Sequence, residues 1–260
     1  MIEDQVTAGA FAGRLLDDDL SPRAFGEGPP ASAWAGAGDA LRQLGLGPGA
    51  EVRVRDLVAV LEGRHARTSA RVLREPVFYD LVFMAPRSVS VAWSLLGADG
   101  RAGIEQAVRA SGHTLLTHLT RTAPLAGGAR VPRSFVAALV LHAVGTRSSV
   151  PGASPGAGTG AGPGAVPPVL HVHGCLFAVQ DGDGSLTAPH EPTLAGEDLQ
   201  RECDAVAGAD LAHRLSVLGY QVRNTALAGT GHAFELDGVP AALIDDEAYW
   251  SNTGCAAGAS

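Results

Sequence analysis

The sequence contains no lysine, so all 19 of its basic residues are arginine. Its three cysteines, Cys175, Cys203 and Cys255, are scattered and form no CxxC pair. This pattern suggests neither a disulfide framework nor a thiolate zinc site. No apolar run reaches the ~18 residues of a transmembrane helix, and the N-terminus lacks the basic and apolar segments of a secretory signal. We therefore expect a cytoplasmic protein without membrane insertion.

The net charge of −8 argues against a simple nucleic-acid-binding protein, but the charge is unevenly distributed. Residues 52–147 carry 13 arginines against 6 acidic residues, whereas the segments on either side are acidic. A basic middle third can hold a phosphate backbone locally. The alternative is an ordinary solvated helix surface, and charge alone does not decide between them.

Residues 148–168 consist almost entirely of Gly, Ala, Pro, Ser and Thr and carry no charge. Such a segment cannot bury enough apolar surface to offset the entropy lost on ordering. It separates two strongly apolar segments, which favours an insertion between paired strands over a domain boundary. We therefore expect one domain over residues 1–260, with a flexible Gly/Pro/Ala-rich insertion at 148–168.

Apolar and β-branched runs predict strands, and longer runs of helical periodicity predict helices. The predicted strands are residues 77–84, 134–144, 169–179, 220–224 and 232–236. The predicted helices are residues 87–96, with Ser88 as a cap, 102–120, and 194–218, which ends at Gly219. Because no regular βαβ repeat is present, we expect an α+β fold with a mainly antiparallel central sheet flanked by helices.

Three histidines lie on the two longest apolar strands. His171 and His173 are two residues apart, so both imidazoles point to one face of their strand. His142 lies near the end of the preceding strand and would face them if the two strands pair antiparallel. Three neutral imidazoles with open coordination positions suit a catalytic divalent ion, which can polarise a scissile phosphate. The alternative is a chance pair of strand histidines without a metal.

The surrounding sequence resembles the N-terminal domain of MobF-type conjugative relaxases, the TrwC and TraI type of HUH endonuclease. Residues 79–90, YDLVFMAPRSVS, resemble the family segment YDLTFSAPKSVS. His142, the Thr-Arg pair at 146–147 and the LHVH segment at 170–173 resemble the family pattern of histidine, Ser/Thr-Arg and LHTH. Further ordered matches extend the resemblance over residues 34–240.

The resemblance implies a function. MobF relaxases nick one strand of plasmid DNA at the transfer origin through a tyrosine that becomes joined to the 5′ phosphate. It implies an HUH relaxase-like two-layer fold and a divalent ion, Mg, Mn or Zn, held by His142, His171 and His173. It also implies single-stranded or hairpin origin DNA as partner, together with other conjugation proteins. Asp80 takes the place of a family aspartate that supports the tyrosine or a histidine.

Two arginines are candidate DNA contacts by the same resemblance. Arg87 stands where the family has lysine after Ala-Pro, and Arg147 belongs to the Thr-Arg pair. A guanidinium can hold phosphate in either place, although with a different geometry from an ammonium group. The alternative for both is a surface arginine without a ligand.

The sequence departs from the family at the nucleophile. Its tyrosines are Tyr79, Tyr220 and Tyr249, whereas the family nucleophiles lie near the N-terminus. The corresponding positions fall near residues 17–18 and 24–25, with Phe11 as a further possibility, and none of these side chains is a phenol. Three accounts stay open: a metal- and DNA-binding remnant, a nuclease that uses metal-activated water, or a wrong start site or truncation.

Two further alternatives concern the histidines. The long insertion at 148–168 can displace His142, and His190 and His213 are then the candidate third ligands. The histidines can also belong to a metal-binding protein unrelated to DNA. Metal content and DNA binding distinguish these hypotheses.

Overall fold

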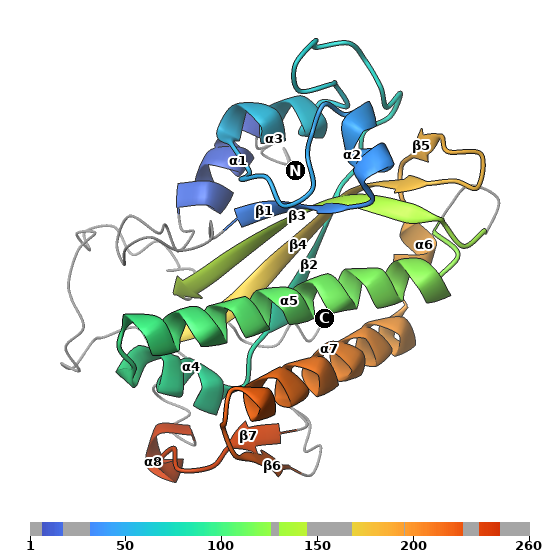
Figure 1. Ribbon diagram of the computed structural model, residues 1–260. Coiled ribbons are helices and arrows are strands. Elements are labelled where there is room, and N and C mark those ends of the chain that lie inside the picture. Colours follow the sequence, from blue (N-terminus) through green and yellow to red (C-terminus); the bar gives the residue numbers. More distant parts are fainter. Residues whose placement is uncertain are drawn as a thin grey trace, which may run out of the picture.

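The computed structural model describes residues 7–17, 32–125, 130–144, 168–194, 196–225 and 234–244. Its centre is a five-stranded sheet in the order β1-β3-β4-β2, with β5 pairing to β4, and all of these pairs are antiparallel. The strands are β1 (Ser32–Gly36), β2 (Tyr79–Met84), β3 (Ser134–Val144), β4 (Pro168–Gln180) and β5 (Leu186–Thr187). The predicted antiparallel sheet flanked by helices is confirmed (Figure 1).

The two longest strands, β3 and β4, form the middle of the sheet. They pair in register from Ala137 opposite Leu176 to His142 opposite His171. Most of their side chains are buried on both faces of the sheet. Burial on both faces explains why these segments read as continuous apolar runs rather than as alternating ones.

The long helices cover one face of the sheet. Helices α4 (Arg87–Leu95) and α5 (Ala98–Thr122) pack against the central strands, and α7 (Glu197–Val217) packs on α5, so their apolar sides join one buried cluster. Gly112 permits the close approach of α5, because a Cβ at this position would lie 2.8 Å from Cγ1 of Val172. The sheet and the α5/α7 pair are therefore the two main layers of the fold (Figure 1).

Three short helices partly cover the opposite face. They are α1 (Ala8–Asp17), α2 (Gly38–Gln43) and α3 (Val54–Leu61), and they lie together above the sheet in Figure 1. Trp34 and Phe177 pack beneath them, with ring centroids 5.9 Å apart. The same face of the sheet carries the histidines, so these helices border the candidate site. Neither these three helices nor strand β1 was predicted from the sequence.

The remaining elements lie after the sheet in the chain. They are the short helices α6 (Glu191–Leu194) and α8 (Ala241–Ile244) and a separate two-stranded hairpin of β6 (Val222–Asn224) and β7 (Phe234–Leu236). The predicted helix over 194–218 is largely α7, which starts later, and Gly219 ends it with φ +93° as expected of a C′ glycine. Residues 148–167 of the predicted insertion lie outside the described residues.

Buried serines fix the segment that follows β2. The hydroxyl of Ser88 accepts a hydrogen bond from the backbone N–H of Leu236 at 2.7 Å, and Ser90 accepts one from that of Leu170 at 3.1 Å. The prediction of Ser88 as a helix cap is wrong, because Pro86 is the N-cap and β7 takes the Ser88 hydroxyl. The bond of Ser90 holds α4 beside the start of β4, next to His171, and the bond of Ser88 joins the N-terminal end of α4 to β7. Among the described helices, none is long and apolar enough to cross a membrane.

Candidate metal centre

Three imidazoles meet on the face of the sheet that α1 borders. His142 and His171 are direct cross-strand partners, and His173 follows on the same face of β4. The ring centroids are 5.2, 4.6 and 5.0 Å apart, and one ligand atom from each ring lies within 4.8 Å of the others. Within the described part of the chain, this is the one group of three or more His, Cys, Asp or Glu side chains so arranged.

The orientation of His173 fits a metal ligand. Its Nδ1 lies 2.7 Å from Oδ2 of Asp80, so the carboxylate accepts the Nδ1 proton. Its Nε2 is buried and has no hydrogen-bond partner among the described residues. A carboxylate on one ring nitrogen fixes the tautomer that leaves the other nitrogen free to bind an ion. The unpartnered Nε2 is therefore the observation in this structure that fits a bound metal.

His171 is held in the same way by the backbone. Its Nδ1 donates to the carbonyl oxygen of Val169 at 3.0 Å, which leaves Nε2 as the acceptor nitrogen. Burial lowers the pKa of His171 to about 4, although the bond to Val169 opposes this, and the neighbouring His173 and His142 lower it further. The imidazole is therefore neutral near pH 7, which is the form that binds a metal.

The last turn of α1 touches the third histidine of the group, His142. Nε2 of His142 lies 2.8 Å from the carbonyl oxygen of Leu15, 127 residues away in the sequence. Leu15 is buried with the apolar side chains under α1, so packing of this helix brings its end to the site. The chain at this turn reads Leu15-Leu16, and neither side chain carries a nucleophile.

The other positions considered for a nucleophile are elsewhere. The ring of Phe11 packs against Phe78 with centroids 4.6 Å apart, which is a core contact. Residues 18 and 24–25 lie outside the described residues. Tyr79 packs against the core on the α5 side of the sheet, the face opposite the histidines.

Asp80 is held on both of its oxygens. Oδ2 accepts from His173, and Oδ1 lies 3.7 Å from Sγ of Cys175. Burial, with the charge and hydrogen bond of Asp80, raises the pKa of the Cys175 thiol well above its usual value, so the sulfur keeps its proton and donates it. The Cys175 side chain is fully buried. This contact was not predicted from the sequence, although the position of Cys175 two residues after His173, on the same face of the strand, could have indicated it.

The other candidate residues lie apart from the three histidines. Arg87 is half-buried and donates from Nη1 to the carbonyl oxygen of Ile244 in α8 at 3.1 Å. Arg147 lies outside the described residues. His190, in the segment before α6, and His213, on α7, are exposed, and Nδ1 of His190 lies 3.0 Å from the hydroxyl of Thr193.

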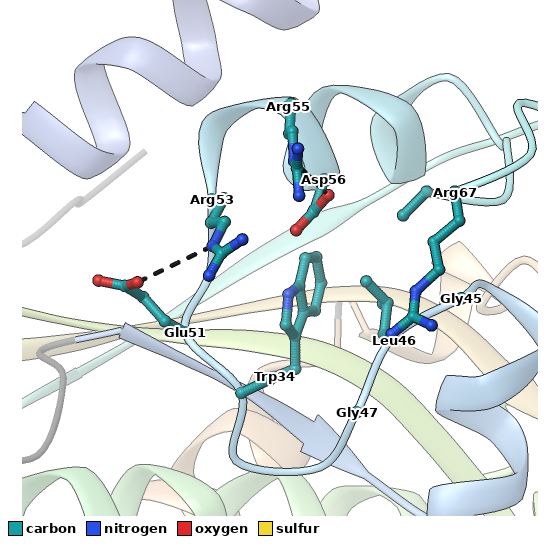
Figure 2. Close-up of a pocket in the computed structure, with 11 residues that line it drawn as sticks. Trp34, Gly45, Leu46, Gly47, Glu51, Arg53, Arg55, Asp56 and Arg67 are labelled. Atoms are coloured by element: carbon teal, nitrogen blue, oxygen red, sulfur yellow. Dashed lines mark ion pairs between the residues drawn. The ribbon is translucent and has the colours of Figure 1, made fainter.

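Arginines border the same face of the sheet beyond α1. A cavity of about 470 Å³ lies between Trp34, α3 and the segment after it (Figure 2). Arg53, Arg55 and Arg67 surround the indole ring in this view. Arg53 faces Glu51 at 4.0 Å, and Arg67 is exposed. The basic middle third therefore includes side chains that open onto the histidine side of the sheet.

Comparison with known proteins identifies the family. The model of the family described as TrwC relaxase matches residues 16–249. Two structures of conjugative relaxase TrwC with oriT DNA, one copper-bound and one metal-bound, each align at 24% identity over 91% of this chain and 74% of theirs, with TM-scores of 0.63 and 0.62.

A third structure contains TrwC with a 27-mer DNA comprising the recognition hairpin and the cleavage site. It aligns at 25% identity over 82% of this chain and 70% of that one, with a TM-score of 0.59. No curated protein matches the chain. The family model spans most of the sequence and the fold agrees with it, so the chain belongs to the TrwC relaxase family.

Proposed function

We propose that this protein is a relaxase domain that binds transfer-origin DNA and acts on one of its phosphodiester bonds with a divalent ion held by His142, His171 and His173. The observation that carries the proposal is the three-histidine group, in which Asp80 occupies Nδ1 of His173 and the buried Nε2 has no partner. Relatives solved with a metal and with oriT DNA support both the ion and the DNA.

When bound, the ion supplies charge neutralisation and polarisation of the scissile phosphate. The protein's own residues prepare its ligands. Asp80 keeps the proton of His173 on Nδ1, and the Val169 carbonyl does the same for His171. Burial keeps His171 neutral. Nε2 of His171 and Nε2 of His173 are therefore available to bind the ion without any rearrangement of β4, the strand that carries them.

The DNA partner is single-stranded or hairpin DNA, held through the basic middle third. Exposed arginines of the segment between α3 and β2, such as Arg67 and Arg74, lie on the part of the chain with the largest positive charge. Arg87 and Arg147 remain candidate phosphate contacts in this proposal. For Arg87 the structure adds a competing role, because its Nη1 already bonds to Ile244.

A second candidate is a metal- and DNA-binding remnant that does not transfer a strand. The observation that favours it is the turn of α1 at the site, which offers Leu15 and Leu16 in place of a hydroxyl group. A phenol needs a base or a metal to attack phosphorus near pH 7, and an alkyl side chain cannot attack it. A metal-activated water would instead make the domain a hydrolytic nuclease.

A labelled-oligonucleotide assay tests both candidates. Hairpin oligonucleotides from the inverted repeats beside the protein's own gene are incubated with Mg²⁺, Mn²⁺ or Zn²⁺ in turn. A covalent protein–DNA adduct supports strand transfer, and a free nicked product supports water as nucleophile. Binding without cleavage under every ion supports the remnant. Failure to bind any of these DNAs at low salt contradicts both candidates.

The same proposal includes the whole chain as one domain with an insertion at residues 148–168. Limited proteolysis should then cut first within this range and leave the two flanking fragments associated. A cut within β3 or β4 before the insertion would contradict the domain assignment.

The proposal also includes a cytoplasmic location and contact with other conjugation proteins. Cell fractionation would test the location, and co-purification from a conjugating host would test the contact.

A further inference from the structure

We propose that the thiol of Cys175 is a positioning group, which fixes the Asp80 carboxylate in the orientation that holds His173. The inference rests on the proposed function only in taking His173 to be a metal ligand. The contact itself is a property of the metal-free protein. It adds to the site a residue that lies outside the histidine pattern.

The strand register places the three side chains together. Asp80 on β2 is the direct partner of Cys175 on β4, and His173 is the diagonal neighbour two residues along. Direct partners in an antiparallel pair have Cβ atoms about 4.5–5.5 Å apart, and diagonal neighbours remain within reach of longer side chains. Asp80 thus lies between a thiol and an imidazole on one face of the sheet.

Each carboxylate oxygen of Asp80 has its own donor. Oδ2 accepts from Nδ1 of His173 at 2.7 Å, and Oδ1 accepts from Sγ of Cys175 at 3.7 Å. Rotation of a carboxylate about χ2 is only weakly restricted by its own torsional preference. A second donor on the other oxygen removes that freedom, because turning Oδ2 away from His173 would also break the bond to the thiol.

Burial makes the thiol an effective anchor. Cys175 is fully buried, whereas the Asp80 side chain retains 29% of its exposure, so water reaches the carboxylate but not the sulfur. A thiol is a weak donor, but in this place water does not compete for the sulfur. An apolar side chain of similar size would fill the space and leave Oδ1 without this partner.

The test combines metal affinity with nuclear magnetic resonance of the metal-free protein. Cys175→Ala removes the donor, Cys175→Ser restores one, and Cys203→Ala is the matched control, a buried thiol on α7. Changing the outer partners of a metal ligand typically costs about 10–100-fold in metal affinity. Because the thiol acts through Asp80, we expect Cys175→Ala to weaken Zn²⁺ binding by roughly 3–10-fold. Cys175→Ser and Cys203→Ala should remain within about twofold of the parent protein.

A double-mutant cycle separates positioning from packing. In the Asp80→Asn background, Cys175→Ala should have little further effect on Zn²⁺ affinity, because the group it orients has changed. An equal reduction of affinity in both backgrounds would overturn the proposal, since the thiol would then act through the core. Unchanged affinity for Cys175→Ala in the parent background would overturn it as well.

The metal-free spectrum tests the contact independently of the proposed function. In ¹⁵N-labelled protein, the hydrogen-bonded Nδ1 proton of His173, assigned by its disappearance in His173→Gln, should shift or broaden in Cys175→Ala and return in Cys175→Ser. If the parent protein binds no Zn²⁺, the metal proposal fails, yet this signal still reports on Asp80. An unchanged signal in Cys175→Ala would show that the thiol positions nothing.

Discussion

His142 and His171 stand directly opposite each other on β3 and β4, with ring centroids 5.2 Å apart and ring planes at 86°. Both rings are almost fully buried. The pairing of the two central strands therefore brings together two histidines that are 29 positions apart in the sequence, and the third, His173, follows from the two-residue period of β4. Disturbing any one ring should affect the whole group.

Replacing His171 tests the metal site. His171→Ala should reduce bound divalent metal to below about one tenth of the parent ratio, because two remaining imidazoles bind such ions much more weakly than three. Metal content after dialysis, measured by mass spectrometry, gives the ratio. His190→Ala is the control, since His190 is exposed and outside the group. An unchanged metal content in His171→Ala would contradict the proposal that the three histidines bind a divalent ion.

Asp80→Asn should weaken metal binding without removing it. The amide can still accept from Nδ1 of His173 but lacks the charge that makes the imidazole a better ligand, so a reduction of about 10–100-fold is expected. Competition titration with a chromophoric chelator measures the affinity. Asp99→Asn, an exposed acid on α5, should leave it unchanged. Equal affinities for Asp80→Asn and the parent would refute a role for Asp80.

The stability of the metal-free protein should fall in acid through His171. Its pKa is lowered by burial to about 4 from an ordinary 6.5, so between these values the unfolded chain binds more protons than the folded one. The free energy of unfolding should therefore decrease as the pH drops from 6.5 to 4, by on the order of 3 kcal/mol from this residue.

Urea titrations in the presence of a chelator measure this dependence. His171→Gln cannot be protonated, so its stability should decrease less steeply over the same pH range than that of the parent protein. His190→Gln serves as the exposed control and should retain the parent slope. The same slope in His171→Gln and the parent would show that His171 does not titrate in this way.

Asp210→Ala should destabilise the α5/α7 layer. The Asp210 carboxylate accepts from Ser111 at 2.9 Å and Thr114 at 3.2 Å on α5, and from Arg214 at 2.6 Å on α7. Burial raises its pKa, but these donors outweigh burial and leave the pKa lowered. Removing the shared acceptor should cost about 1–3 kcal/mol in the free energy of unfolding.

The matched control for this variant lies on the same helix. Asp198 pairs with Arg201 at 2.8 Å, but both side chains are highly exposed. Exposed pairs contribute about 0–1 kcal/mol, so Asp198→Ala should be nearly neutral in chemical denaturation. A destabilisation by Asp198→Ala as large as that by Asp210→Ala would contradict the distinction drawn from burial.

DNA binding should depend on salt through the arginines between α3 and β2. Removing one arginine that binds a phosphate should reduce the slope of log affinity against log salt by about 0.7 on single strands and 0.9 on duplex. Arg67→Gln combined with Arg74→Gln should therefore reduce the slope for a hairpin by up to about 2. Fluorescence anisotropy at several salt concentrations measures it, and Arg201→Gln on α7 is the exposed control. An unaltered slope in the double variant would place the DNA elsewhere.

Local sequence patterns were sufficient to identify the family, the two central strands and the shared face of His171 and His173. Continuous apolar runs, a two-residue period and contiguous family segments are all legible within a short stretch of chain. The place of the third histidine, His142, was conditional on antiparallel pairing, which the register of β3 and β4 confirms.

The groups that surround the histidines follow from tertiary packing instead. The bonds of Asp80 to His173, of Leu15 to His142 and of Arg87 to Ile244 join residues 93, 127 and 157 positions apart. Such contacts depend on strand register and helix packing, which no local window of sequence contains. Sequence could propose Asp80 for the site, whereas the fold assigned it to a histidine and added the thiol of Cys175 to its other oxygen.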